Sequence, residues 1–178
     1  MIFSVWKFHV SADDDVDGPP IHGNTTLEIV WTVIPALLVI AIGVVSAVVL
    51  AKNGAAGPKP MQVHVIGQQF AWKFRYDDYG KLTTGELVLP VGRETKFTME
   101  SVDVIHSFWV PQFGQKMDAV PGIETTILVT PKREGEFAVV CAELCGLGHA
   151  TMRAKASVVS EVEFEKWVAA ERGGGRTQ

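Results

Sequence analysis

The feature that most constrains the fold of this 178-residue chain is a continuous apolar run from Leu27 to Leu50, in which Glu28 is the one ionisable residue. As an α-helix rising about 1.5 Å per residue, the run would extend roughly 36 Å, enough to cross the hydrocarbon core of a bilayer. A soluble helix of this length would need cover on all sides, and the rest of the chain is too small to provide it. The run predicts a transmembrane helix over residues 27–50, in which Pro35 is tolerated because neighbouring groups can satisfy the freed carbonyl.

Glu28 stands at one end of this helix and has two interpretations. An acid in the first turn is favoured by the helix dipole and can face the lipid head groups. A carboxylate at a membrane edge can also belong to a proton path. Lys7 precedes the helix, whereas Lys52 and Lys59 follow it, so the positive-inside rule weakly favours a cytoplasmic C-terminal side.

The segments that flank the helix differ from it in composition. Residues 1–10 are apolar but too short to cross a bilayer, and they lack the features of a signal peptide. An acidic, turn-rich loop follows them, so residues 1–26 form one N-terminal segment before the helix. Residues 51–60 are rich in Gly and Pro, which predicts a linker.

Residues 61–160 change to a period of two, which predicts a β-domain. Short β-branched and aromatic runs alternate with turn signals, as in a β-sandwich or barrel. The expected strands are 63–66, 70–76, 86–89, 95–99, 104–110, 125–130, 136–141 and 154–159. Ser160 is the expected N-cap of an amphipathic helix in residues 161–178, which end in a flexible tail.

The charge balance narrows the class of partner. The chain has 16 Lys and Arg against 20 Asp and Glu, for a net charge of −4. This balance argues against nucleic acid as a partner. A modest acidic excess suits a basic protein partner better.

The chain's two cysteines stand in one short stretch, with the spacing Cys141-x3-Cys145-x3-His149-x2-Met152. Thiolate, imidazole and thioether form a soft ligand set that suits copper better than calcium, magnesium or manganese. A mononuclear blue-copper site uses one Cys, two His and a weak Met. Two cysteines allow two thiolates to bridge two copper ions, and each ion then needs an imidazole. A disulfide or a structural zinc remains the alternative at this point.

A second histidine must come from elsewhere in the chain. His9 and His22 precede the membrane helix and are set aside. His64 lies on an early strand, where we interpret it as a surface or edge residue. His106 lies on an aromatic-rich strand that could flank the cysteine loop, and is the best candidate.

Three motifs resemble subunit II of the haem–copper cytochrome c oxidases, the subunit that carries the dinuclear copper centre CuA. Leu27–Pro35 is similar to the start of that family's second transmembrane helix. Val104–Gly122 is similar to its first copper-ligand segment, and Cys141–Met152 to its copper loop. The motifs occur in the family's order, and the resemblance covers nearly the whole chain.

The resemblance implies a mainly β fold, a cupredoxin-like barrel or sandwich preceded by a transmembrane helix. Cys141 and Cys145 would bridge both copper ions. His106 and Met152 would complete the coordination of one ion, and His149 would bind the other. The copper domain would lie on the outer face of a bacterial plasma membrane.

Two acidic residues acquire roles from the same resemblance. The backbone carbonyl of Glu143 would complete the second copper ion, and its side chain would help to bind a magnesium shared with subunit I. Glu28 would lie near a proton path on the cytoplasmic side. This orientation is opposite to the one that the positive-inside rule weakly favours, and the resemblance outweighs that rule here. The implied function is to accept electrons from cytochrome c and pass them to haem in subunit I, where oxygen is reduced to water with proton pumping.

The chain departs from the family in three places. The family has two transmembrane helices, and residues 1–10 resemble only a stub of the first. Phe70 stands where the family has the tryptophan through which electrons are thought to arrive, so Trp72 could replace it or serve only as core packing. The β-domain is not followed by a Cys-x-x-Cys-His motif, so a fused haem c domain is not expected.

Two other functions use similar residues. A nitric oxide reductase can carry a CuA subunit on a related pattern, and the partner subunit would distinguish it. A membrane-anchored copper chaperone or thiol redox protein leaves His149 and Met152 unexplained. A quinol oxidase subunit would lack Cys141 and Cys145.

Overall fold

The computed structural model describes residues 1–10, 18, 20 and 22–174. Its residues divide into two compact units, Met1–Ala47 and Val48–Gln178. Most of the expected acidic loop and the last four residues of the chain lie outside the described part.

The N-terminal unit is helical. Helix α1 spans Ile2–Lys7, six residues, and α2 spans Thr25–Gly54. Helix α2 contains the apolar run and continues through Pro35, and its large apolar side chains are exposed. Its start is capped by Asn24, whose side-chain oxygen accepts a hydrogen bond from the Leu27 N–H at 3.1 Å. Among the described helices, α2 alone has the length and composition to cross a membrane.

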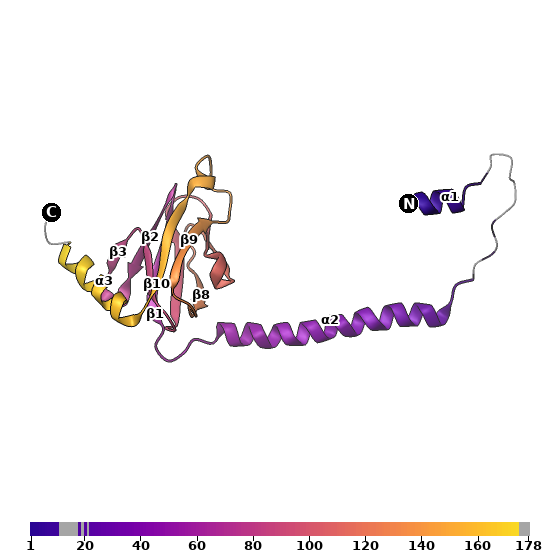
Figure 1. The fold of residues 1–178 in the computed structure, drawn as a ribbon, viewed down its shortest axis with the longest axis horizontal. Helices are drawn as coiled ribbons and strands as arrows, with labels where there is room; N and C mark the ends of the chain where they lie inside the picture. Colours follow the sequence, from indigo (N-terminus) through magenta and orange to yellow (C-terminus); the bar gives the residue numbers. More distant parts are fainter. Residues whose placement is uncertain (11–17, 19, 21, 175–178) are drawn as a thin grey trace. The chain divides into compact units, whose positions relative to one another are not determined.

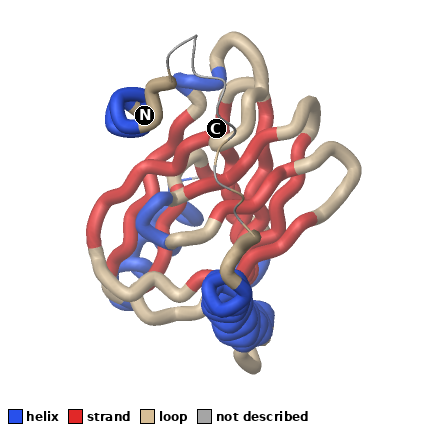
Figure 2. Tube along the Cα trace, turned by 90° about the vertical axis from the view of Figure 1, so that its right-hand side faces the viewer, coloured by secondary structure: helices blue, strands red, loops and turns tan. Residues whose placement is uncertain are grey.

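The second unit contains a β-domain of two five-stranded sheets (Figures 1 and 2). The first sheet has the order β3-β2-β1-β5-β8, with the bounds β3 Leu82–Thr84, β2 Ala71–Tyr76, β1 Met61–Gln68, β5 Thr95–Ser101 and β8 Thr125–Val129. The second has the order β4-β10-β9-β6-β7, with the bounds β4 Leu87–Pro90, β10 Arg153–Val159, β9 Gly135–Cys141, β6 His106–Trp109 and β7 Lys116–Ala119. The expected fold class, mainly β after an apolar helix, is confirmed.

Several strand boundaries differ from those expected. Strand β2 begins after Phe70, and β6 begins only at His106. Strands β3 and β7 were not expected, because both are short and β7 has no β-branched or aromatic residue. β1 pairs in parallel with β5, and β10 with β4, whereas the other strand pairs are antiparallel.

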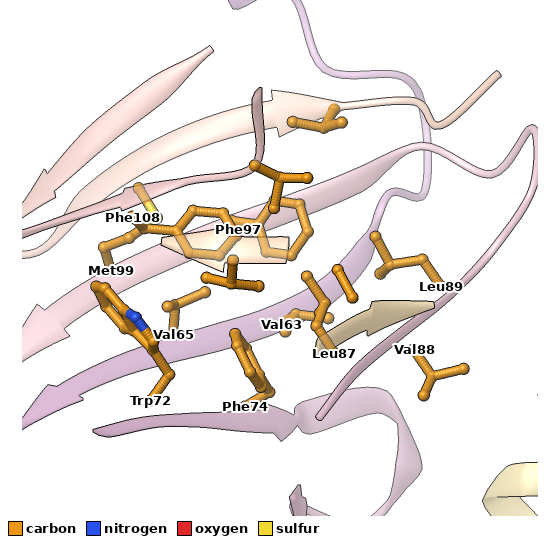
Figure 3. Close-up of a cluster of buried hydrophobic side chains, with 14 of the residues drawn as sticks. Val63, Val65, Trp72, Phe74, Leu87, Val88, Leu89, Phe97, Met99 and Phe108 are labelled. Carbon is orange, nitrogen blue, oxygen red and sulfur yellow. The ribbon is translucent and has the colours of Figure 1, made fainter. Parts of the chain in front are cut away.

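Aromatic side chains fill the space between the two sheets. Trp72 and Phe74 from β2 point toward Phe97 of β5 and Phe108 of β6 (Figure 3). The Phe97 and Phe108 rings have centroids 5.4 Å apart, and Trp72 meets Phe108 edge-on at 6.0 Å. Burying aromatic side chains of this size is a main source of stability in a domain. The core therefore ties β6, which carries His106, to the first sheet.

Helix α3, Glu161–Gly174, packs against the outside of this body. Phe164 and Val168 are its buried residues, and the Phe164 and Trp167 rings lie against Tyr76. Ser160 caps its start, as expected.

Candidate metal centre

The two cysteines lie side by side without a bond between them. Cys141 is the last residue of β9, and Cys145 lies in the loop that follows. Both side chains are buried and free, and their Sγ atoms are 3.8 Å apart. A disulfide needs about 2.05 Å, so these are two separate thiols that face each other. This arrangement suits two sulfurs that share metal ions.

His106 is fully buried at the start of β6 and faces Cys141. Its Nδ1 lies 3.8 Å from the Cys141 Sγ, and its Nε2 lies 2.8 Å from the Asp103 carboxylate. Nε2–H donates to that carboxylate, so the Nδ1 lone pair points toward the sulfur. Metal-binding histidines usually have such a carboxylate on the second ring nitrogen. His106, Cys141 and Cys145 form a group of buried donors whose ligand atoms lie within 4.8 Å of one another.

Asp103 is held in place by more than His106. Burial disfavours its charge, but hydrogen bonds from the Gln69 N–H, His106 and the Val104 N–H outweigh it and lower its pKa to about 2. The carboxylate is therefore ionised at neutral pH. The sequence motifs gave no sign of this residue, although it lies three positions before His106.

The remaining expected donors lie against the same two sulfurs. The Glu143 carbonyl oxygen is 3.2 Å from the Cys141 Sγ. His149 Nδ1 and Met152 Sδ are each 3.7 Å from the Cys145 Sγ. Two donors that each bind one ion at about 2.0–2.3 Å in tetrahedral geometry lie roughly 3.3–3.8 Å apart. The six groups therefore have the spacing of ligands that share ions.

Short backbone segments bring these donors together. His149 opens a 3₁₀ turn, His149–Thr151, and Met152 follows it at full burial. The Cys141 N–H donates to the Met152 carbonyl at 3.2 Å, which closes the loop at its base. The Ala142 N–H donates to the Ser107 carbonyl at 2.9 Å, which fixes the loop against β6. The loop is thus closed at its base and fixed to β6 next to Cys141.

The Cys145 thiol is protonated at neutral pH. Burial, reinforced by the neighbouring Cys141, raises the pKa of Cys145 to about 11. A metal that binds here must displace this proton. Two thiols, two imidazoles and a thioether form a soft donor set, which fits copper and disfavours hard cations such as calcium or magnesium between the sulfurs.

Comparison with known proteins places this geometry in a family. Residues 82–159 match the family model described as cytochrome C oxidase subunit II, periplasmic domain, and residues 1–49 match the model of its transmembrane domain. The chain belongs to the cytochrome c oxidase subunit II family. One match therefore lies in the β-domain and the other covers most of the apolar helix, and both are to domains of the same family.

Curated relatives in the cytochrome c oxidase subunit II family agree with this assignment. Cytochrome c oxidase subunit 2 of Thermostichus vulcanus is 33% identical over 94% of this chain and 67% of the relative. The protein of the same name from Cereibacter sphaeroides is 32% identical over 98% of this chain and 69% of its own length. That of Alkalihalophilus pseudofirmus is 36% identical over 91% of this chain and 49% of its own length. The chain spans between about half and two thirds of these relatives.

Solved structures match the β-domain. The periplasmic domain of subunit II of cytochrome oxidase from Bradyrhizobium japonicum superposes with a TM-score of 0.62 at 31% identity, over 66% of this chain and 97% of that one. A haem–copper terminal oxidase dimer matches with a TM-score of 0.54 over 72% of this chain and 97% of that one, but its 22% identity bears on the fold alone.

Phe70 and Trp72 are the two candidates for the residue through which electrons arrive. Both lie near the donors, but they differ in their exposure to solvent. Phe70 is 39% exposed and packs against the cysteine loop, where a Cβ on Gly148 would come 2.5 Å from its ring. Trp72 is 3% exposed and meets the His106 ring edge-on at 5.9 Å. The Gln69 side chain donates to the Cys145 carbonyl at 2.7 Å and so ties the Phe70 turn to the loop.

Glycines permit these close approaches. A Cβ on Gly67 would come 3.0 Å from the His106 ring, and one on Gly146 would come 3.3 Å from the Phe70 ring. In the sequence alone these glycines had no assigned role, so they did not indicate the close contacts. Glu143 presents an exposed side chain, and Glu28 lies exposed in the first turn of α2, in the other unit.

Proposed function

We propose that this chain is the subunit of a cytochrome c oxidase that receives electrons, holding a dinuclear CuA centre. His106, Cys141, the Glu143 carbonyl, Cys145, His149 and Met152 would hold the two copper ions. The observation that carries the proposal is the ring of four further donors, at 3.2–3.8 Å, around two unbonded buried sulfurs. When bound, the copper pair supplies a one-electron redox site whose charge is shared over two ions.

The protein's own contribution is to hold the donors still. Each histidine and each sulfur comes from a strand end or a bonded loop, and the Asp103 carboxylate fixes the His106 ring. Ligands that do not move when charge changes keep the reorganisation energy low, as electron transfer requires. The donor set also leaves no position for a substrate, so the chain carries out no substrate chemistry.

The wider role follows from the family. The chain would accept an electron from cytochrome c and pass it to haem in subunit I, where oxygen is reduced to water with proton pumping. The domain would lie on the outer face of a bacterial plasma membrane, anchored by α2. The net charge of −4 suits a basic donor protein.

The proposal also assigns roles to the other expected residues. The exposed Glu143 side chain is free to reach a magnesium shared with subunit I. Glu28 would belong to a proton path, which its place in the first turn of an apolar helix permits. Phe70 is the better candidate than Trp72 for the surface where electrons arrive, because it lies between solvent and the loop.

The test uses the full chain in detergent, reduced and then loaded with copper. We expect two copper ions per chain and an electron paramagnetic resonance signal in which one unpaired electron is shared by both nuclei. His106→Ala should change that signal, whereas the matched control His22→Ala should leave it unchanged. One copper per chain, or a signal localised on one ion, would contradict the dinuclear centre. Turnover of the assembled oxidase with oxygen or nitric oxide would then distinguish an oxidase from a reductase.

A further inference from the structure

A second group of metal-type donors lies away from the cysteine loop. A ring nitrogen of His64 and one carboxylate oxygen each from Glu100 and Glu124 lie within 4.8 Å of one another. His64 is on β1, Glu100 is on β5, and Glu124 directly precedes β8. Among the described residues, this is the one such group that contains no cysteine.

The sheet register explains why three residues distant in sequence meet. β1 and β5 are parallel, with His64 opposite Thr98 and Ile66 opposite Glu100. β5 and β8 are antiparallel with Met99 opposite Thr125, and the next step of this register brings Glu124 beside Glu100. β1 alternates buried and half-buried residues, and His64 is on the half-buried, outward side. The group therefore lies on the outer surface of the β3-β2-β1-β5-β8 sheet, between the central strand β1 and the edge strand β8.

The two nitrogens of His64 have different surroundings. Nε2 lies 3.1 Å from the Asp77 carboxylate, to which its N–H donates. Nδ1 is then an acceptor, and it is buried without a hydrogen-bond partner in the described part of the chain. An unsatisfied buried polar atom is uncommon and costs stability. A histidine whose second nitrogen donates to a carboxylate is the usual arrangement of a metal ligand.

Among the described residues, the two carboxylates also lack a full counter-charge. Like charges on neighbouring strands destabilise a sheet. The nearest cation to Glu100 is Arg75, whose Nη1 is 4.0 Å from the Glu100 carboxylate, while its Nε already bonds Asp77 at 3.0 Å. A bound divalent cation would offset the repulsion between Glu100 and Glu124 and satisfy the His64 nitrogen at the same time.

We propose that His64, Glu100 and Glu124 bind a divalent transition-metal ion, with Zn²⁺ the best match. One imidazole and two carboxylates plus water form a four-coordinate set that zinc accepts. Calcium and magnesium prefer oxygen ligands alone, so the imidazole selects against them. The ion would connect β1, β5 and β8 and would act as a structural clamp, because zinc has no redox chemistry.

The clamp is independent of the proposed copper centre. Its ligands come from the first sheet, whereas Cys141 and His106 belong to the second. An ion that binds only the folded domain stabilises it by mass action. The expected consequence is a domain whose melting temperature rises when Zn²⁺ is added.

The experiment uses the full chain in detergent with Cys141→Ser and Cys145→Ser, so that the cysteine loop cannot take up zinc. Equilibrium dialysis against Zn²⁺ should give one tightly bound ion per chain. Co²⁺ in its place should give visible d–d absorption typical of nitrogen and oxygen ligands, without a thiolate charge-transfer band. Zn²⁺ should raise the melting temperature measured by circular dichroism.

Variants then test the assignment in that background. Glu124→Gln, at an exposed position, should weaken Zn²⁺ binding at least about tenfold and remove the melting shift, as should His64→Ala. Asp77→Asn should weaken binding on the order of 10- to 100-fold by releasing the orientation of His64. The matched controls Glu134→Gln, in an exposed loop, and His22→Ala should bind zinc as the parent does.

Two results would overturn the proposal. The first is a parent chain that retains no zinc after dialysis. The second is zinc binding with unchanged affinity in Glu124→Gln, because the proposal makes Glu124 a ligand. A loss of binding in this variant would not be due to misfolding, since Glu124 is exposed.

Discussion

Phe70 lies so close to Gly148 that a Cβ on the glycine would come 2.5 Å from the Phe70 ring. The backbone of Gly148 has φ −88°, so a side chain there would be excluded only by this contact and not by backbone strain. The ring and the cysteine loop therefore fit together only because position 148 has no side chain.

Gly148→Ala should consequently displace either Phe70 or the loop. Overpacking of this kind costs about 1–3 kcal/mol. We expect a lower free energy of unfolding in urea and a changed copper spectrum. Gly85→Ala is the matched control, because a Cβ there meets nothing within 4 Å. The double variant Phe70→Ala/Gly148→Ala should recover part of the loss; strict additivity of the two single variants would show that the contact does not matter.

Asp103→Asn should weaken copper binding while leaving the domain folded. The change keeps the shape of the side chain but removes the charge that orients the His106 ring, which is usually worth about 10- to 100-fold in metal affinity. Competition with a copper chelator measures the loss. Asp118→Asn, an exposed carboxylate on neighbouring strand β7, is the control. Equal affinities for the two variants would exclude an orienting role for Asp103.

The sequence predicted the donors more completely than their supports. Cys141, Cys145, His149 and Met152 lie within twelve residues, so their proximity follows from local spacing. Asp103 could not be found in this way, because the Gln69 N–H that fixes it comes from a turn 34 residues earlier. The transmembrane helix was predicted from the sequence because the length of the apolar run alone indicates it.

The register of strand pairing explains why the sequence did not predict the group formed by His64, Glu100 and Glu124. His64 was interpreted as a surface or edge residue, and it does lie on an outward face. It is in β1, however, the central strand of its sheet, and not at an edge. Glu100 and Glu124 become its neighbours only through the β1–β5–β8 pairing. Nothing in the intervening segment, which enters the other sheet as β6 and β7, predicts that pairing.

Phe70 and Trp72 should affect different properties when each is replaced by alanine. Trp72 is 3% exposed in the core, so Trp72→Ala should cost about 3–5 kcal/mol of stability. Phe70 is 39% exposed, so Phe70→Ala should cost about 1 kcal/mol. In the assembled oxidase, we expect Phe70→Ala to slow electron uptake from cytochrome c in stopped-flow measurements. A normal uptake rate in Phe70→Ala would exclude Phe70 from that path.

The stability of helix α3 should depend on pH through Glu163. Its carboxylate accepts hydrogen bonds from the Ser160 hydroxyl at 2.9 Å and the Ser160 N–H at 3.2 Å, which lower its pKa below the usual value. A carboxyl with a lowered pKa in the folded state stabilises the protein above its unfolded-state pKa. That contribution disappears as the pH falls through the lowered, folded-state pKa.

Glu163→Gln should therefore lower the free energy of unfolding at pH 7. In acid, where Glu163 of the parent is protonated, the free energies of unfolding of the parent and the variant should become similar. Ser160→Ala should remove part of the same pH-dependent contribution, because the Ser160 N–H still donates to Glu163. As the loss of an N-cap, it should also cost about 1 kcal/mol at neutral pH. Urea unfolding of the full chain in detergent, followed by near-ultraviolet circular dichroism at several pH values, measures both. Because Glu163 is exposed, salt should weaken its contribution. A difference between parent and Glu163→Gln that stays constant from neutral to acid pH would mean that the carboxylate charge does not stabilise the helix start.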